Sequence, residues 1–338
     1  MTARLSRPGD PVKTIAFILS LALGLLAAPL TSEAQPSRKV PRIGYLILTP
    51  LAEKPSPERA AFLEGLRELG YVEGKSIAIE YRSAGWNAEL LPDLAEELVR
   101  LKVDVIVSGG GGAAAAARQA TKSIPIVVPA APDPVAGGLA ASLARPGGNI
   151  TGTSLMAPEL GSKRLELLKE TVPRISRVAV LWNPVGVGKL EWQETQAAAR
   201  RLGVTVQSHE VRNADDLAKA LEAMSKRRPD AMTMFFDPQT SGYREIVSDF
   251  ALKNRLPTIF GAREFVAAGG LMSYGANVPE LFRRAAVYVD KILKGARPQD
   301  LPIEQPTKFE LIVNVKTAKA LGITIPPSVL LRTDQVVE

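Results

Sequence analysis

The sequence predicts an α/β protein made of two lobes, each built around a parallel β-sheet. Short apolar, β-branched stretches alternate with stretches of helical periodicity, which is typical of βαβ units. This alternation restarts near residue 150. The length of 338 residues also favours two domains, at roughly 150 residues per domain. Alternation and length therefore indicate the same organisation.

The first half of the chain supplies the elements of one lobe. Apolar residues at 61, 62, 66 and 69 share one face of a helix, and Gly70 ends that helix. A leucine stripe at 90, 91, 94, 98 and 101 predicts the next helix. The strands are expected at 40–48, 76–81, 103–107, 124–128 and 150–153, and the helices at 57–69, 90–101, 113–120 and 135–143.

The second half repeats the pattern and adds a less regular tail. We expect strands at 177–181, 204–211, 231–236, 257–260, 271–274 and 309–313, and helices at 160–171, 190–202, 214–225, 243–254 and 278–293. The extra strands and the long helix near the end suggest that the chain crosses between the lobes more than once.

The first 34 residues are interpreted as a signal peptide. Arg4, Arg7 and Lys13 precede an uncharged apolar run at 15–28, which is shorter than the roughly 20 residues that span a membrane. Cleavage is expected after Ala34, and an N-terminal membrane anchor remains the alternative. The protein is therefore expected in the periplasm. Without cysteine it is not expected to be a lipoprotein acylated on cysteine.

Composition excludes several kinds of chemistry. The chain has no cysteine, so disulfides, thiolate metal sites and cysteine nucleophiles are excluded. A single histidine, His209, is expected at the surface and lies near no nucleophile motif. The net charge of +7 is dispersed without interleaved aromatic residues, which does not indicate nucleic-acid binding. No cofactor and no metal are expected.

Ligand-binding residues are expected where strands end. In open parallel sheets, ligands bind beyond the carboxyl ends of the strands. The candidates in the first half follow its strands, and those in the second half follow the corresponding strands there. They are Thr49, Ser108, Gly109, Gly110, Gly111 and Asp133, followed by Asn183, Asp237, Arg263 and Tyr274.

The glycine run at 109–112 admits three interpretations. Its spacing, with Asp133 further on, matches a dinucleotide-binding fingerprint. The run nevertheless follows the third predicted strand, and an exported protein meets no NAD pool. The second interpretation is a helix N-terminus that binds an anionic or carbonyl group of another ligand. The third is a glycine turn without a ligand.

The remaining candidates also have structural alternatives. Asp133 and Asp237 each precede a proline, so each could cap a helix or turn instead of accepting a hydrogen bond from a ligand amine. Asn183 has the same two interpretations. Arg263 could bind a carboxylate or form an exposed ion pair. Tyr274 and Trp86 could stack on a ligand or cover the edge of a core.

Five stretches together resemble ABC-transporter substrate-binding proteins, in the group that includes binders of tryptophan and other aromatic amino acids. This chain departs from the resemblance after Ser108, where its relatives commonly have a polar residue and a proline in place of four glycines. Backbone N–H contacts to a ligand are therefore expected there. The stretches are 61–74, 133–135 with 142–152, 263–265 with 269–275, 306–310 and 321–328.

The resemblance implies a periplasmic-binding-protein type I-like fold, in which two Rossmann-like lobes are joined by a three-crossing hinge. The crossings map near 151–156, 265–271 and 301–307. One lobe then comprises 40–153 plus 271–303, and the other 156–268 plus 307–338. The resemblance also implies capture of a small ligand by hinge closure and its delivery to an inner-membrane ABC permease, without catalysis.

The leading hypothesis is therefore a monomeric periplasmic solute-binding protein for ABC import, with a small amino-acid-like or aromatic ligand. One alternative is a nucleotide-dependent Rossmann-type enzyme that uses the loop at Gly109–Gly112. A second alternative is an extracytoplasmic ligand sensor that signals to a membrane partner.

Overall fold

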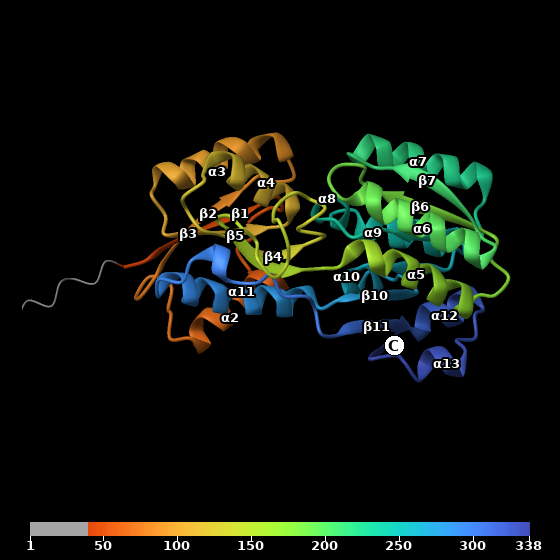
Figure 1. The fold of residues 1–338 in the computed structure, drawn as a ribbon. Coiled ribbons are helices and arrows are strands. Elements are labelled where there is room, and N and C mark those ends of the chain that lie inside the picture. The colour runs from red at the N-terminus through yellow and green to blue at the C-terminus, as the bar shows by residue number, and fades with distance from the viewer. Residues whose placement is uncertain (1–39) are drawn as a thin grey trace, which may run out of the picture. The chain divides into compact units, whose positions relative to one another are not determined.

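Two β-sheets organise the part of the chain that the computed structural model describes, residues 40–338 (Figure 1). The predicted signal peptide, 1–34, lies outside the described residues. One sheet has five strands in the order β2-β1-β3-β4-β5. The other has seven in the order β12-β11-β10-β9-β8-β6-β7. The two-sheet α/β architecture agrees with the sequence prediction.

All strands of the five-stranded sheet run parallel. Its helices lie between successive strands, as βαβ units require. The strands are β1 (Arg42–Ile47), β2 (Ala78–Ser83), β3 (Val105–Gly109), β4 (Ile126–Ala131) and β5 (Ile150–Ser154). The helices are α2 (Pro57–Glu68), the 3₁₀ turn η1 (Ala88–Leu90), α3 (Leu91–Arg100) and α4 (Gly111–Ala120).

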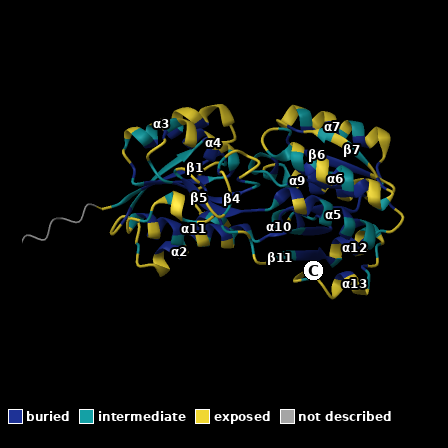
Figure 2. Ribbon diagram, viewed as in Figure 1, coloured by how far each residue is buried: buried dark blue, intermediate teal, exposed yellow. Residues whose placement is uncertain are grey.

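Alternate residues of these strands face two separate helical layers. On β1, Tyr45 packs with α2 and with α11 (Val278–Leu293), whereas its neighbour Leu46 packs with α3 and α4. Figure 2 shows the strands largely buried and the outer helix faces exposed. Strands covered on both faces explain the near-continuous apolar runs in the sequence.

Helix α11 joins this layer from late in the sequence because α2 lets it approach closely. A Cβ at Gly65 of α2 would lie 2.6 Å from the backbone oxygen of Arg283 and 3.0 Å from Cβ of Ala286. Any larger residue at 65 would push the two helices apart.

The seven-stranded sheet is parallel except where β10 meets β11, which run antiparallel. Its strands are β6 (Arg177–Trp182), β7 (Thr205–Glu210), β8 (Ala231–Met234), β9 (Thr258–Phe260), β10 (Met272–Ala276), β11 (Phe309–Asn314) and β12 (Gln335–Val337). The helices are α5 (Ala157–Thr171), α6 (Gly188–Leu202), α7 (Ala214–Arg227), α8 (Pro238–Ser241), α9 (Arg244–Lys253), α10 (Arg263–Ala267), α12 (Val315–Leu321) and α13 (Pro327–Leu330), with the 3₁₀ turn η2 (Pro298–Asp300) before β11.

Two expectations about individual elements were wrong. The helix predicted at 135–143 is a series of turns, because Gly138 adopts a φ of +67° and leads the chain out after one turn. The strand near 271, expected in the first lobe, is β10, which pairs with β9 and β11 of the seven-stranded sheet. The chain therefore passes to α11 only after Ala276.

Two of the segments that link the sheets lie side by side. Thr153, at the end of β5, forms a bridge with Glu304, and the amide of Ser154 donates to the carbonyl of Glu304 at 2.8 Å. Glu304 in turn forms a bidentate ion pair with Arg284 of α11.

No helix among residues 40–338 is long and apolar enough to cross a membrane.

Candidate functional site

The predicted residues of the first half gather at the carboxyl edge of the five-stranded sheet. Ser108 lies beside Leu46 in the β1–β3 register, so the β3 loop emerges next to the β1 loop that carries Thr49. Asp133 follows the end of β4, the next strand in the sheet. The parallel order thus places Thr49, the Ser108–Gly111 segment and Asp133 along one edge.

Ser108 is the least satisfied polar group of this edge. Its side chain is fully buried, and its Oγ has no hydrogen-bond partner among the described residues. Two residues later Gly110 caps α4, a ten-residue helix, with a φ of +106°. A buried hydroxyl beside a helix N-terminus suits an anionic or carbonyl oxygen of a ligand.

Asp133 acts as a local cap. Its Oδ1 accepts hydrogen bonds from the amides of Val135 and Ala136, each at 3.0 Å. The capping interpretation of this residue is therefore confirmed, and within residues 40–338 its hydrogen bonds use one carboxylate oxygen.

Asn183 and Asp237 meet at the carboxyl edge of the seven-stranded sheet. Asn183 Nδ2 donates to Asp237 Oδ2 at 3.3 Å, and Asp237 Oδ1 caps α8 through the amides of Gln239 and Thr240. Burial raises the pKa of Asp237, although these three donors lower it. A buried carboxylate of this kind is stabilised by a cation placed against it.

Arg263 and Tyr274 contact other partners than Asn183 and Asp237 do. Arg263 donates to Gln335 Oε1 at 2.6 Å and lies 3.7 Å from a carboxylate oxygen of Glu310, so it forms the exposed pair of the structural alternative. The ring of Tyr274 packs against Phe309, with ring centroids 6.1 Å apart. Both side chains therefore have protein partners on the β11 side of the sheet.

Loops from the two carboxyl edges approach each other. A Cβ at Gly110 would lie 2.7 Å from Cγ of Pro238, the first residue of α8. Trp86, whose φ is +74°, has its ring 3.1 Å from the position of a Cβ at Gly242. The candidate residues of both sheets therefore face one region.

An aromatic group next to this region was missed by sequence reasoning. Tyr45 is buried, with ring centroids 5.6 Å from those of both Phe62 and Tyr81. Phe236, directly before Asp237, packs against the cluster that contains Tyr45 and also against the core of its own sheet. The alternation Gly44-Tyr45-Leu46 in β1 was the available signal for a tyrosine on one face.

A buried ion pair was also missed. Arg164 of α5 and Glu191 of α6 pair with each other, and the side chain of each is only 3% exposed. Arg164 occupies the apolar stripe of α5, between Leu160 and Leu168, one turn from each. A charged residue in the middle of an apolar stripe was the signal for a buried partner.

His209 is half-buried on β7 rather than fully at the surface. Its Nε2 is buried and has no hydrogen-bond partner among the described residues. Burial lowers the pKa of His209, and the nearby charge of Arg227 lowers it further. Both effects favour the neutral form of the imidazole.

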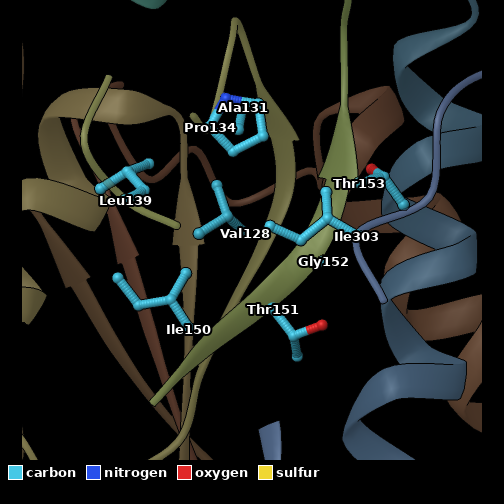
Figure 3. Close-up of a pocket in the computed structure, with 9 residues that line it drawn as sticks. All are labelled: Val128, Ala131, Pro134, Leu139, Ile150, Thr151, Gly152, Thr153 and Ile303. Atoms are coloured by element: carbon cyan, nitrogen blue, oxygen red, sulfur yellow. The ribbon is translucent and has the colours of Figure 1, made fainter. Parts of the chain in front are cut away.

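A shallow recess without room for a water molecule lies between β4 and β5, near the segment that carries Ile303 (Figure 3). Its only side-chain polar groups are already bonded: Thr151 Oγ1 donates to the carbonyl of Leu301, and Thr153 Oγ1 to that of Pro129.

Residues 40–338 contain no group of three acidic, histidine or cysteine side chains that could hold a metal ion.

The family model of ABC transporter substrate-binding proteins matches residues 53–337. The chain belongs to this family. It is a family of solute-binding proteins, which argues against the nucleotide-dependent enzyme considered above. The resemblance inferred from the five sequence stretches is thereby confirmed.

Similar proteins agree with this assignment. A tyrosine-binding protein of Clostridioides difficile is 30% identical over 290 residues, covering 85% of this chain and 82% of that protein. A structure from Streptococcus pneumonia in complex with L-Trp has a TM-score of 0.81 and 27% identity, covering 88% of this chain and 99% of the other. A conserved domain protein from Vibrio cholerae has a TM-score of 0.82 and 28% identity, with coverages of 88% and 100%. The fold is accordingly periplasmic-binding-protein type I-like.

Proposed function

We propose that this protein captures an aromatic amino acid, with L-tyrosine or L-tryptophan as the first candidates, for ABC import. The observation that carries this proposal is the pair of relatives described as tyrosine-binding and as an L-Trp complex, at 30% and 27% identity. The chemistry of the two carboxyl edges supports this proposal. They offer one place for the ligand carboxylate, another for its ammonium group, and nearby rings for its aromatic side chain.

The ligand carboxylate is assigned to the edge of the five-stranded sheet. Ser108 Oγ is buried without a partner among the described residues, and α4 begins three residues later, at Gly111. A helix N-terminus carries partial positive charge and free amides, which stabilise an anion. Thr49 and the amides of Gly109–Gly111 complete this proposed subsite, and Asp133 borders it.

The ligand ammonium is assigned to the edge of the seven-stranded sheet. Asp237 is half-buried beside Asn183, and the loss of solvent around it raises its pKa. An ammonium group at Asp237 Oδ2 would lower this raised pKa and stabilise the ionised carboxylate. Because Arg263 and Tyr274 have partners on the β11 side, we give them a secondary role at the rim.

The aromatic side chain of the ligand is assigned to the rings near Asp237. Phe236 lies directly before Asp237 and packs against the cluster of Tyr45, Phe62 and Tyr81. Offset and edge-to-face ring contacts stabilise an aromatic guest beyond the area it buries. A binder of aromatic ligands would use such a wall.

We infer that the two sheets belong to two lobes that close on the ligand by a hinge. The proposed crossings lie near 151–156 and 301–307, where the strands of the two segments pair, and directly after β10 instead of at 265–271. Hinge closure around a ligand is a common transition of two-lobe proteins.

The remaining parts of the proposal concern the cell. We propose that residues 1–34 direct the chain to the periplasm, and that the protein acts there as a monomer and passes its ligand to an inner-membrane permease. A sensor role remains the alternative, because sensing and import begin with the same binding step.

A thermal-shift screen of the purified protein tests the proposed ligand class. L-Tyr, L-Trp and L-Phe are compared with L-Leu, L-Glu, glucose and benzoate. A ligand at 100 times its Kd adds about 2.7 kcal/mol of stability, which corresponds to a shift of about 5 °C. Shifts confined to the aromatic amino acids support the proposal; shifts only with glucose or benzoate would assign another ligand class.

A further inference from the structure

The buried Arg164–Glu191 pair lies beneath the loops of the candidate site. Arg164 Nη1 donates to the backbone oxygen of Tyr274 at 3.2 Å, in β10. A Cβ at Gly261, directly after β9, would lie 3.2 Å from the same nitrogen and 2.8 Å from Cβ of Phe236. The guanidinium therefore bonds to the backbone of β10 and lies close to Gly261, which directly follows β9 and packs against Phe236.

Glu191 connects the pair to the loop after β6, which carries Asn183. It lies in the first turn of α6, and this turn packs against the loop after β6 because Gly188 has no side chain. A Cβ at Gly188 would lie 2.0 Å from the backbone oxygen of Asn183. One ion pair thus underlies the loops that carry Asn183 and Asp237.

The pair is incompletely satisfied. Arg164 Nε is buried and has no partner among the described residues, and the same holds for Thr195 Oγ1, one turn after Glu191. If Glu191 were neutral, its hydrogen bond from the guanidinium would lose the charge of the carboxylate and weaken, and the bond to the backbone oxygen of Tyr274 would be the one left unchanged. Its position would then be less fixed, and so would the loops above it.

We propose that the Arg164–Glu191 pair positions the ligand-binding loops and that protonation of Glu191 makes ligand affinity depend on pH. The proposal rests on the proposed function, since it takes the ligand ammonium to lie against Asp237. The ionised pair holds the guanidinium beneath the loops in the arrangement that binds the ligand.

Several charges act on Glu191. Burial raises its pKa to about 7, Arg164 lowers it, and Asp237 and Glu159 of α5 raise it further. Two other titratable residues nearby interact with different partners: Lys163 of α5 pairs with Glu166, and His209 of β7 interacts with Arg227. Lys189 and Glu194 lie on either side of Glu191 in its own helix. Around neutral pH, Glu191 is therefore divided between its two protonation states.

Ligand binding is coupled to this proton. A ligand ammonium at Asp237 cancels the negative charge that favours protonated Glu191, so binding releases a proton from Glu191. By linkage, affinity must then rise as the pH rises through the pKa of this group.

Calorimetric titration of L-Tyr and L-Trp at pH 6, 7 and 8 tests the proposal, with Glu191→Gln as the variant. We expect the Kd of the wild type to fall by about three- to tenfold from pH 6 to pH 8. The variant imitates the protonated group, so its Kd should stay near the wild-type value at pH 6. The matched control is Glu194→Gln, an exposed change on the same helix, which should follow the wild type.

Equal pH profiles for the wild type and Glu191→Gln would overturn the proposal and leave the proposed function standing. A second measurement needs no variant: titration in two buffers of different ionisation enthalpy should show proton release by the wild type at pH 7, and zero release overturns the coupling.

A failure of the proposed function is distinguishable. If no aromatic amino acid binds at any pH, the ligand assignment fails. The positioning pair is then tested by the unfolding temperature of the ligand-free protein. Because the pKa of Glu191 is raised in the folded state, its contribution to stability is lost as the pH rises. As the pH is raised from 5 to 8, the unfolding temperature of the wild type should therefore fall relative to that of Glu191→Gln. Equal slopes would overturn the proposal.

Discussion

Single buried polar groups define the candidate site. Ser108 on one sheet is fully buried, and its Oγ has no partner among the described residues, whereas Asp237 on the other sheet is half-buried and burial raises its pKa. Buried polar groups without partners cost free energy, so a folded protein retains them where a ligand supplies the partner. We therefore propose that these two residues hold the ligand.

The first prediction at this scale concerns Arg164. Arg164→Met removes the partner of Glu191 and leaves a buried carboxyl, which should lower the free energy of unfolding by about 3–5 kcal/mol in urea denaturation at pH 8. Arg200→Met, an exposed change on α6, should cost less than 1 kcal/mol.

A double variant separates lost charge pairing from lost packing. Arg164→Met combined with Glu191→Met replaces the pair by apolar side chains and should recover most of the stability. If Arg164→Met is as mild as Arg200→Met, the pair does not stabilise the fold as described.

At the scale of elements, the start of α4 depends on glycine at one position. Gly110 has a φ of +106° and lies against Pro238, whereas Gly112 lies inside the helix, where a Cβ would meet Leu91 Cδ1 at an ordinary 3.8 Å. Gly110→Ala should therefore destabilise the protein by about 1–3 kcal/mol. Gly112→Ala should be neutral or stabilise it by up to about 1 kcal/mol.

Urea denaturation of both variants is the measurement. A loss of stability in Gly110→Ala, without a loss in Gly112→Ala, would confirm the conformation of the loop. Equal effects of the two substitutions would contradict it.

A carboxylate joins the starts of two strands in the seven-stranded sheet. Asp230, before β8, accepts hydrogen bonds from the amide and hydroxyl of Ser176 and from Arg177 at the start of β6. Burial opposes ionisation of this group, but these donors outweigh it and lower the pKa of Asp230 to about 2. Asp230→Asn should cost about 1–2 kcal/mol at pH 7.

The cost of Asp230→Asn should vary with pH in a defined direction. Because the folded pKa is depressed, the stability from Asp230 is present above about pH 4 and is lost as the pH falls through about 2. Urea midpoints at pH 7, 4 and 2.5 should converge for the wild type and the variant. Asp249→Asn, at an exposed weak pair, serves as the control, and a constant difference at all three pH values would exclude the assigned hydrogen bonds.

Sequence reasoning located most elements because strands covered on both faces and amphipathic helices leave strong patterns. It placed Asn183 and Asp237 in neighbouring loops because parallel strands end at one edge. It could not find Arg263's partners, since Glu310 and Gln335 come from the antiparallel tail, whose pairing no local pattern encodes. The strand at 272–276 was misassigned for the same reason.

At the scale of the whole molecule, the chain leaves the seven-stranded sheet after β10, packs α11 on the five-stranded sheet, and then re-enters the seven-stranded sheet as β11. Two linking segments pair through Thr153 and Glu304, so they can bend together. A proposed hinge of this kind permits the two carboxyl edges to enclose a ligand without unfolding either sheet.

Calorimetric titration of L-Tyr and L-Trp into the wild type, Ser108→Ala and Asp237→Asn tests the central claim most directly. Asn retains an oxygen that can cap α8, so the second substitution removes chiefly the charge. We predict binding by the wild type and an affinity about tenfold or more weaker in each variant, one from each sheet, with unchanged stability. Wild-type affinity in both variants, or no binding of either amino acid by the wild type, would contradict the account.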